Sequence, residues 1–166
     1  MTRILDLSRM EAKMMDYQLK ESDLMPVIQK SLLKLAPIAR KGKIDLELKP
    51  PPDLPPAKID VERISQLMEN LIGNALKFSS EGGKVVLSVY VRNYGKQFLE
   101  VSVADTGCGM DTETQARVFD PFFSTKAKGK GSGLGLASVY GIIKNHGGFI
   151  HVESEKGKGT TFTIYL

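Results

Sequence analysis

The chain has 166 residues, of which 42% are hydrophobic and 25% charged, a length and balance typical of one soluble domain with at most a short appendage. No apolar run approaches the roughly 18 to 20 residues that cross a bilayer, and the N-terminus lacks a signal-peptide layout, so we expect a cytoplasmic protein without membrane contact. The single cysteine, Cys108, excludes an internal disulfide framework. The net charge of +4 includes a basic cluster at Lys126, Lys128 and Lys130, which suits either nucleic acid or a loop that meets nucleotide phosphates.

The first 41 residues predict two helices separated by a short strand. Residues 1–16 carry apolar side chains at helical spacing but no start signal, so they are predicted to end a longer helix. The stretch YQLKESDL, residues 17–24, is typical of a strand. Asp23 is placed to cap a helix that runs to about Lys41 and is interrupted near Pro37, because proline lacks the amide hydrogen of a helix interior.

The middle of the chain predicts three strands and one long helix. Residues 44–49 alternate apolar and polar side chains as a strand does, and the proline-rich residues 50–56 form a stiff surface connection. A helix is predicted over residues 60–78. Residues 84–91 and 98–105 are predicted to be strands of a hairpin joined through RNYGKQ.

The last part of the chain predicts a glycine-rich segment, a helix and a second hairpin. The helix covers about residues 134–145, and the strands cover residues 149–154 and 160–166. Three helices beside about five strands indicate an α/β two-layer sandwich with a mixed, mostly antiparallel sheet.

The long helix carries polar side chains at regular spacing beside its apolar face. Asn70, Asn74 and Lys77 are four and three residues apart, so they share a narrow stripe. Amide oxygens suit a hard cation such as magnesium, and a lysine ammonium can meet a phosphate. The same side chains are also compatible with the solvated face of an amphipathic helix. The apolar arc beside them consists of Val61, Ile64, Leu67, Met68, Leu71, Ile72 and Ala75.

A second candidate site follows the strand over residues 98–105. The sequence VADTGCGM places Asp105 at the end of that strand, ahead of Gly107 and Gly109. A carboxylate there can accept a hydrogen bond from an exocyclic amine, and the glycines let the backbone turn closely beneath a flat ring. The pattern also fits a simple turn, since aspartate and glycine are common turn residues.

Three phenylalanines precede the glycine-rich segment. Exposing Phe119, Phe122 and Phe123 would be costly, so they are predicted to anchor this part of the chain to the core. Alternating glycines at 129, 131, 133 and 135 are tolerated where the backbone itself has a task, such as moving as a lid or meeting phosphate at the start of a helix. We expect a lid between the aromatic anchor and the helix.

Taken together and in this order, four stretches resemble one family closely. NLIGNALKFS resembles its N box, DTGCGM its first glycine box, FDPFF its F box and GKGSGLGL its second glycine box. The family is the ATP-binding catalytic domain of bacterial sensor histidine kinases, within the superfamily that includes gyrase, Hsp90 and MutL. The resemblance runs over residues 24–166, and SRMEAKM is similar to the end of the second dimerisation helix of these kinases. It implies a dimerisation-helix end at residues 1–16 and a catalytic domain with the Bergerat fold at residues 17–166.

The resemblance also implies a role for each motif residue. Asp105 would recognise the adenine amine of ATP, with Thr160 of GKGTTF nearby. Asn70 and Asn74 would hold Mg²⁺, and Asn70 and Lys77 would be the catalytic residues, with Lys77 facing phosphate. The remaining nucleotide-binding positions would be Gly107, Gly109, Lys126, Gly131, Gly133, Leu134 and Gly135, of which Gly131, Gly133 and Gly135 would give the lid its flexibility and supply amides at the start of a helix.

The phosphoacceptor motif of the family, a histidine followed by an acidic residue and a proline, is absent. His146 lies in an HGG turn that the family often has, which favours a structural role, and His151 lies in a predicted strand. We therefore expect a kinase fragment that binds Mg-ATP but cannot phosphorylate itself. The implied partners are the missing dimerisation domain of a homodimeric parent and a response regulator, and not nucleic acid.

Other functions on the same fold are weighed against this one. Gyrase-type and Hsp90-type ATPases resemble the chain but carry a glutamate that activates water on the N-box helix, where this chain has Asn70, an amide that cannot take a proton. Glu69 lies about 100° around the helix and is expected to point away. A serine kinase of the superfamily is a further alternative. Intact boxes disfavour a non-catalytic module, and nucleic-acid binding lacks an aromatic platform.

Overall fold

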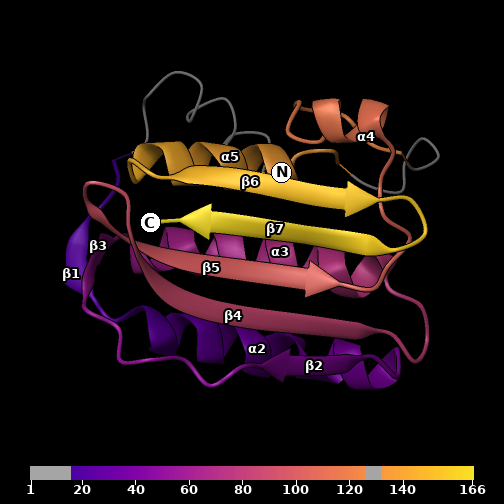
Figure 1. The fold of residues 1–166 in the computed structure, drawn as a ribbon, viewed down its shortest axis with the longest axis horizontal. Helices are drawn as coiled ribbons and strands as arrows, with labels where there is room; N and C mark the ends of the chain where they lie inside the picture. Colours follow the sequence, from indigo (N-terminus) through magenta and orange to yellow (C-terminus); the bar gives the residue numbers. More distant parts are fainter. Residues whose placement is uncertain (1–15, 126–131) are drawn as a thin grey trace.

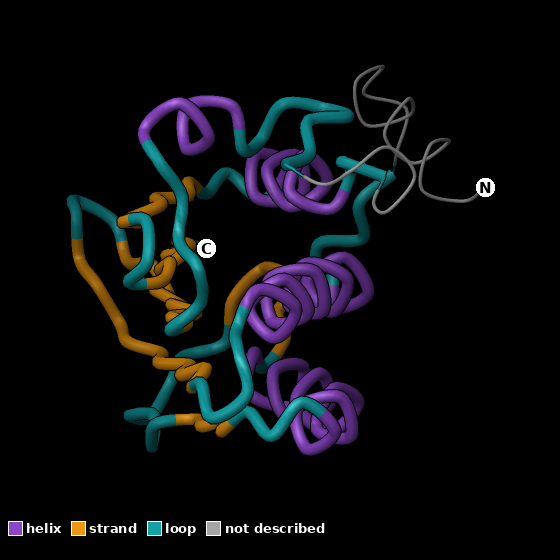
Figure 2. Tube along the Cα trace, turned by 90° about the vertical axis from the view of Figure 1, so that its right-hand side faces the viewer, coloured by secondary structure: helices purple, strands orange, loops and turns teal. Residues whose placement is uncertain are grey.

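The helices and strands of the computed structural model, which describes residues 16–125 and 132–166, form two layers. In chain order they are β1 (Lys20–Ser22), α2 (Leu24–Lys41), β2 (Asp45–Leu48), β3 (Ala57–Ile59), α3 (Val61–Phe78), β4 (Lys84–Asn93), β5 (Gln97–Asp105), α4 (Thr112–Arg117), α5 (Gly135–Asn145), β6 (Phe149–Glu155) and β7 (Gly159–Tyr165). Figure 1 looks onto the sheet, with α2, α3 and α5 behind it, and Figure 2 shows the helices stacked on one side of the strands.

The large sheet has five strands in the order β2-β4-β5-β7-β6. β4, β5, β7 and β6 pair antiparallel, whereas β2 pairs parallel to β4. The parallel pair is possible because the connection between β2 and β4 contains α3 and is long enough to cross over. β1 and β3 form a separate two-stranded antiparallel sheet. The arrangement confirms the predicted α/β two-layer sandwich with a mixed, mostly antiparallel sheet.

The core lies between the helices and one face of the sheet, and α3 is at its centre. Ile64, Leu67, Met68 and Ile72 of α3 have no exposed surface. Each such burial stabilises the fold by about 1.5–3 kcal/mol. α3 is therefore held rigidly, and any side chain at the edge of its buried face has a well-defined position.

The ends of α3 are specified by local hydrogen bonds. The Asp60 side chain accepts a hydrogen bond from the amide of Arg63 at 3.1 Å, which satisfies one free donor of the first turn. At the other end, the Ser79 hydroxyl donates to the Ala75 carbonyl at 2.8 Å. The predicted bounds of this helix agree closely with the observed ones, but Val61 is 44% exposed and does not belong to the buried arc. Val61 occupies the first turn, before the helix reaches the sheet.

The predicted interruption of α2 at Pro37 is wrong. α2 continues from Leu24 to Lys41 with Pro37 inside it. The carbonyl that a proline at this position leaves unpaired belongs to Leu33, and Leu33 is 77% exposed, so water can satisfy that carbonyl. Asp23 precedes the helix as predicted, but its side chain makes no capping hydrogen bond.

α4 is a helix that the sequence analysis did not predict. It has six residues and no buried side chain, so it lacks the apolar periodicity that identifies a helix. Its N-cap is Asp111, whose side chain accepts from the Thr114 amide at 2.8 Å. Residues 1–15, which contain most of the predicted dimerisation-helix end, lie outside the described residues.

Candidate nucleotide-binding site

A cavity of about 480 Å³ lies between α3, the loop after β5, α4 and the start of α5. This volume is within the range of about 300–1,000 Å³ that is typical of small-molecule sites. The walls come from stretches that are far apart in sequence, and all four of the sequence motifs contribute at least one lining residue.

The three polar residues of the α3 stripe line this cavity together. Asn70 and Asn74 are half-buried and Lys77 is exposed. The Asn70 side-chain nitrogen donates to the Gly135 carbonyl at 3.4 Å, so its amide oxygen remains available as an acceptor beside the first turn of α5. The stripe therefore forms one wall of a cavity rather than an ordinary solvated helix face.

Asp105 forms the opposite part of the wall, at the end of β5. Its Oδ1 accepts hydrogen bonds from the Gly107 amide at 2.8 Å and the Thr160 amide at 3.3 Å. No hydrogen bond to Oδ2 comes from the described part of the chain, which leaves this oxygen as an acceptor. Burial raises the pKa of the Asp105 carboxyl above its ordinary value, although the two backbone donors oppose this effect. Gly107 and Thr160 are buried behind the wall and act on the cavity through Asp105.

Glycine is required at two positions of the loop after Asp105. A Cβ at Gly107 would lie 2.7 Å from the Phe78 carbonyl oxygen. Gly109 has a φ of +65°, and a Cβ there would overlap the backbone carbonyl of Glu155. The backbone of this loop is therefore packed between the end of α3 and the β6–β7 hairpin.

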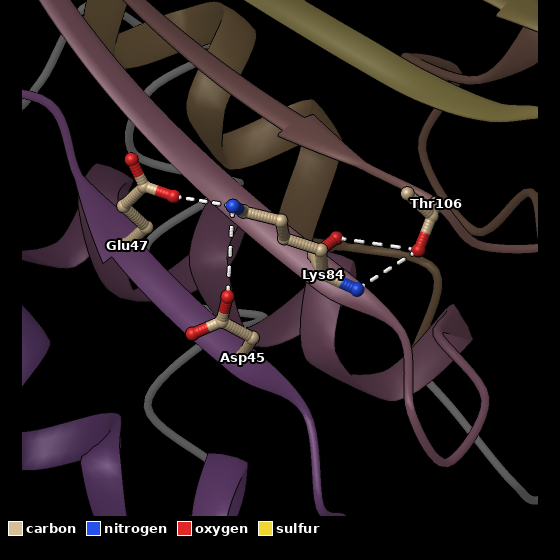
Figure 3. A network of polar contacts seen from close by, with 4 residues as sticks. All are labelled: Asp45, Glu47, Lys84 and Thr106. Carbon is tan, nitrogen blue, oxygen red and sulfur yellow. Dashed lines mark hydrogen bonds and ion pairs between the residues drawn. The ribbon is translucent and has the colours of Figure 1, made fainter.

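The same loop is held from its other side by Lys84 (Figure 3). The Lys84 amide donates to the Thr106 hydroxyl at 2.9 Å, and the Thr106 amide donates to the Lys84 carbonyl at 3.1 Å. The Lys84 ammonium lies 2.5 Å from Glu47 and 3.6 Å from Asp45, both on β2. The hydrogen bond to Glu47 raises the pKa of Lys84. One residue of β4 thus joins β2 to the loop that follows Asp105.

The start of α5 brings two of the predicted glycines to the cavity. Gly133 and Gly135 line it, whereas Leu134 is 2% exposed and lies beneath the surface. Gly133 has a φ of +64°, and a Cβ there would lie 2.5 Å from the backbone of Phe122. Lys126 and Gly131, and with them most of the predicted lid, lie outside the described residues.

The prediction of an aromatic anchor is only partly correct. Phe119 packs against the core, with its ring centroid 6.2 Å from that of Phe162. Phe123 is half-buried, lines the cavity and has the Arg117 guanidinium 4.6 Å from its ring centroid. Phe122 is 65% exposed with a φ of 63°, so it does not anchor the segment. Its amide donates to the Gly133 carbonyl at 2.9 Å, which shows that the backbone of Phe122, rather than its ring, makes the contact.

Several cavity residues were not found by sequence reasoning. Lys156, in the turn between β6 and β7, lines the cavity together with Cys108 and Met110. A lysine in a turn is normally solvated, so nothing in the sequence distinguished it. Ser154 and Gln115 stand behind Met110 and were missed as well, because only the pairing of β6 with β7 brings them near Asp105.

Glu69 and His146 occupy the positions that the sequence analysis assigned them. Glu69 pairs with Lys34 of α2 at 2.7 Å and therefore points away from the cavity. His146 accepts a hydrogen bond at Nε2 from the Asp60 amide at 3.0 Å, and its Nδ1 lies 2.7 Å from the Ile142 carbonyl. The Asp60 amide can only donate, so Nε2 must be unprotonated and Nδ1 carries the hydrogen. His146 is thus a neutral residue of the fold that joins the end of α5 to the start of α3.

The donor groups of the stripe fit magnesium bound together with a nucleotide. Among residues 16–125 and 132–166, no cluster of three His, Cys, Asp or Glu side chains could hold a metal by itself. Mg²⁺ usually keeps several waters and binds through one or two protein oxygens plus substrate phosphates. The amide oxygens of Asn70 and Asn74, four residues apart on one wall of the cavity, match that requirement.

The chain belongs to the family of histidine kinase-, DNA gyrase B- and HSP90-like ATPases, whose model matches residues 59–166. Within that family it is an ATP-binding catalytic domain of the sensor histidine kinase type. It is 38% identical to Drug sensory protein A of Synechocystis sp. over 98% of this chain and 26% of that protein. It is 42% identical to the sensor histidine kinase ZraS of Klebsiella oxytoca over 87% of this chain and 30% of that protein.

Solved structures agree with this assignment. The crystal structure of full-length ShkA in complex with AMPPNP matches with a TM-score of 0.87 at 30% identity, over 99% of this chain and 34% of that one. The chain spans about a quarter to a third of the length of the three relatives described here. In the part of the chain that the structure describes, no helix is both long and apolar enough to span a bilayer.

Proposed function

We propose that this chain binds Mg-ATP in the cavity and donates the γ-phosphoryl group to a histidine on a dimerisation domain of its parent protein, for onward transfer to a response regulator. The observation that carries the proposal is that Asp105 and the α3 stripe line one cavity. A carboxylate acceptor and a set of phosphate- and magnesium-binding groups are the two ends that a bound ATP requires. The AMPPNP complex of the similar kinase ShkA supports the assignment of the nucleotide.

At the adenine end, the chain supplies a fixed acceptor. Gly107 and Thr160 hold one oxygen of Asp105, and the other oxygen is available to accept a hydrogen bond from the exocyclic amine. A hydrogen bond to a charged acceptor contributes about 1.5–3 kcal/mol. The close packing of Gly107 and Gly109 keeps this oxygen in position without rearrangement when the base binds.

At the phosphate end, the chain supplies positive charge and magnesium ligands. Lys77 would contact a phosphate, and Asn70 and Asn74 would hold Mg²⁺ against the phosphates. When bound, the metal would neutralise negative charge on the group that is transferred. Gly133 and Gly135 bring the backbone close to the same end, at the start of α5.

The acceptor is proposed to come from outside this chain, because most of the catalysis of phosphoryl transfer is positioning of the acceptor. A cytoplasmic, homodimeric parent would present its own histidine to this cavity. The curated relatives are longer proteins with sensor kinase names, which supports a parent with further domains. No interaction with nucleic acid or membrane is proposed.

The hydrolytic alternative is disfavoured by Glu69. A water-activating carboxylate must face the phosphates, but Glu69 is paired with Lys34 on the far side of α3. Asn70, which does line the cavity, cannot accept a proton from water. A serine kinase of the same superfamily would share the cavity and differ in its acceptor.

The proposal is tested by incubating the chain with γ-labelled ATP and the separately prepared dimerisation domain of the parent protein. We expect acid-labile label on that domain and none when its phosphoacceptor histidine is replaced by glutamine. Acid-stable label on serine would identify a serine kinase. Rapid release of phosphate without labelling would identify an ATPase.

A further inference from the structure

Ser154 lies in one row with Asp105 and Thr160 across three neighbouring strands. Asp105 of β5 is opposite Thr160 of β7, and Thr160 is opposite Ser154 of β6. Side chains alternate between the two faces of a sheet, and this row is in phase with the buried Val103 and Phe162, so it faces the helices and the cavity side. Ser154 is therefore two strands away from the carboxylate that we assign to the adenine amine.

The Ser154 hydroxyl contacts three polar groups. Its Oγ accepts a hydrogen bond from the Met110 amide at 2.8 Å and lies 3.0 Å from the Gly159 carbonyl oxygen and 2.8 Å from Thr160 Oγ1. Gln115 keeps the region fixed, since its side-chain nitrogen donates to the carbonyls of Met110 at 3.1 Å and of Ser154 at 2.9 Å.

The chemistry of these partners determines where the hydroxyl hydrogens point. A serine hydroxyl has one hydrogen and two lone pairs. The Met110 amide can only donate to it and the Gly159 carbonyl can only accept from it. The arrangement that satisfies all three contacts therefore has Thr160 donating to Ser154. The Thr160 hydrogen is then used inside the protein, and its oxygen offers only lone pairs to any further partner.

We propose that Ser154 is a positioning residue for base selection, which holds the Thr160 hydroxyl as an acceptor beside Asp105 and so favours 6-amino over 6-oxo purine nucleotides. The inference rests on the proposed function, because it concerns the adenine end of the same cavity. An exocyclic amine has hydrogens to donate to acceptors. The carbonyl of a 6-oxo purine needs a donor instead, and with Ser154 in place neither Asp105 nor Thr160 provides one.

The test is to measure by calorimetry the affinities of the chain for ATP and inosine triphosphate, which differ at position 6 of the purine. We expect the wild-type protein to prefer ATP. Ser154→Ala frees the Thr160 hydrogen, so we expect the preference to fall by about three- to tenfold, the effect of one hydrogen bond. Ser154→Thr restores the hydroxyl and is expected to restore the preference. Ser102→Ala is the matched control, because that hydroxyl contacts only Ser88 at 3.4 Å.

Two results would overturn the inference and leave the proposed function standing. One is an unchanged ATP preference in Ser154→Ala. The other is an unchanged preference in Thr160→Val, a variant that leaves Ser154 in place and removes the hydroxyl through which it acts. If Ser154 acts through Thr160, adding Ser154→Ala to Thr160→Val changes the preference no further. Wild-type protein that bound both nucleotides equally would instead overturn the adenine assignment itself.

Discussion

At the scale of single residues, Asp105 separates a binding effect from a folding effect. In Asp105→Asn the amide oxygen can keep both backbone hydrogen bonds, from Gly107 and Thr160, so the loop stays in place. The amide nitrogen then replaces Oδ2 and turns a donor toward the adenine amine. We expect a loss of about 1.5–3 kcal/mol, or roughly ten- to hundredfold, in ATP affinity.

Calorimetric titration with ATP measures this loss, and thermal unfolding serves as its control. We expect the unfolding midpoint of Asp105→Asn to stay close to that of the wild-type protein. An unchanged ATP affinity in the folded variant would remove Asp105 from the adenine site.

Asn74 tests the magnesium assignment. Asn74→Ala removes a proposed metal ligand from the wall of the cavity but leaves the buried face of α3 intact. We expect weaker nucleotide binding chiefly when Mg²⁺ is present, since the lost group acts through the metal. Titrations with ATP in magnesium and in a chelator measure the difference, with Ser65→Ala on the same helix as a control. An equal loss in both conditions would show that Asn74 contacts the nucleotide directly.

At the scale of elements, His146 connects the end of α5 to the start of α3. Burial lowers the pKa of His146 below its ordinary value of 6.5, against the opposing effects of the Ile142 carbonyl and the nearby Asp60 carboxylate. Between the folded and unfolded pKa values, the unfolded chain binds more protons. The stabilisation is therefore complete above about pH 6.5 and is lost as the pH falls toward the folded pKa.

Urea unfolding between pH 7.5 and 5.5 measures this effect. We expect the free energy of unfolding to fall over that range in the wild-type protein and in His151→Gln, whose histidine is exposed on β6. We expect a smaller fall in His146→Gln. The same fall in all three proteins would assign the pH dependence to other groups.

The elements also show what local sequence can and cannot reveal. α3 was predictable because its apolar residues recur every three to four positions and Asp60 caps it. α4 was not, because its six residues bury nothing. The continuity of α2 through Pro37 depends on the exposure of the turn before it, and exposure is a property of the folded molecule.

The candidate site divides in the same way. Asp105, Gly107 and Gly109 are adjacent in sequence, so their motif could be identified directly. The hydrogen bonds that fix Asp105 come from Thr160, 55 residues away, and only the pairing of β5 with β7 brings it there. Residues such as Ser154 and Lys156 belong to no motif and become part of the site only through the sheet.

At the scale of the whole molecule, both histidines are held away from any acceptor position. His146 is fixed by two hydrogen bonds at the far ends of α3 and α5, and His151 lies on the sheet face opposite the helices, out of phase with the buried Val152 row. Neither can move in line with a γ-phosphate in the cavity. We therefore expect that the chain alone binds Mg-ATP but acquires no label from γ-labelled ATP.

The measurement is the retention of acid-labile label on the isolated chain, in parallel with ATP binding by calorimetry. His146→Gln and His151→Gln serve as matched variants, and we expect all three proteins to remain unlabelled. Acid-labile label that disappears in one variant would identify that histidine as an acceptor and contradict the prediction.

The strand order has a consequence for the time at which the site forms during synthesis. β7 is the last strand in chain order, yet it lies inside the sheet between β5 and β6. A nascent chain that has emerged only as far as β6 leaves β5 and β6 with unpaired edges, a state that is prone to association with other chains. It also lacks Thr160, one of the two donors that hold Asp105. The ribosome must therefore release nearly the whole domain before the domain can hold a nucleotide, so ATP cannot assist its early folding.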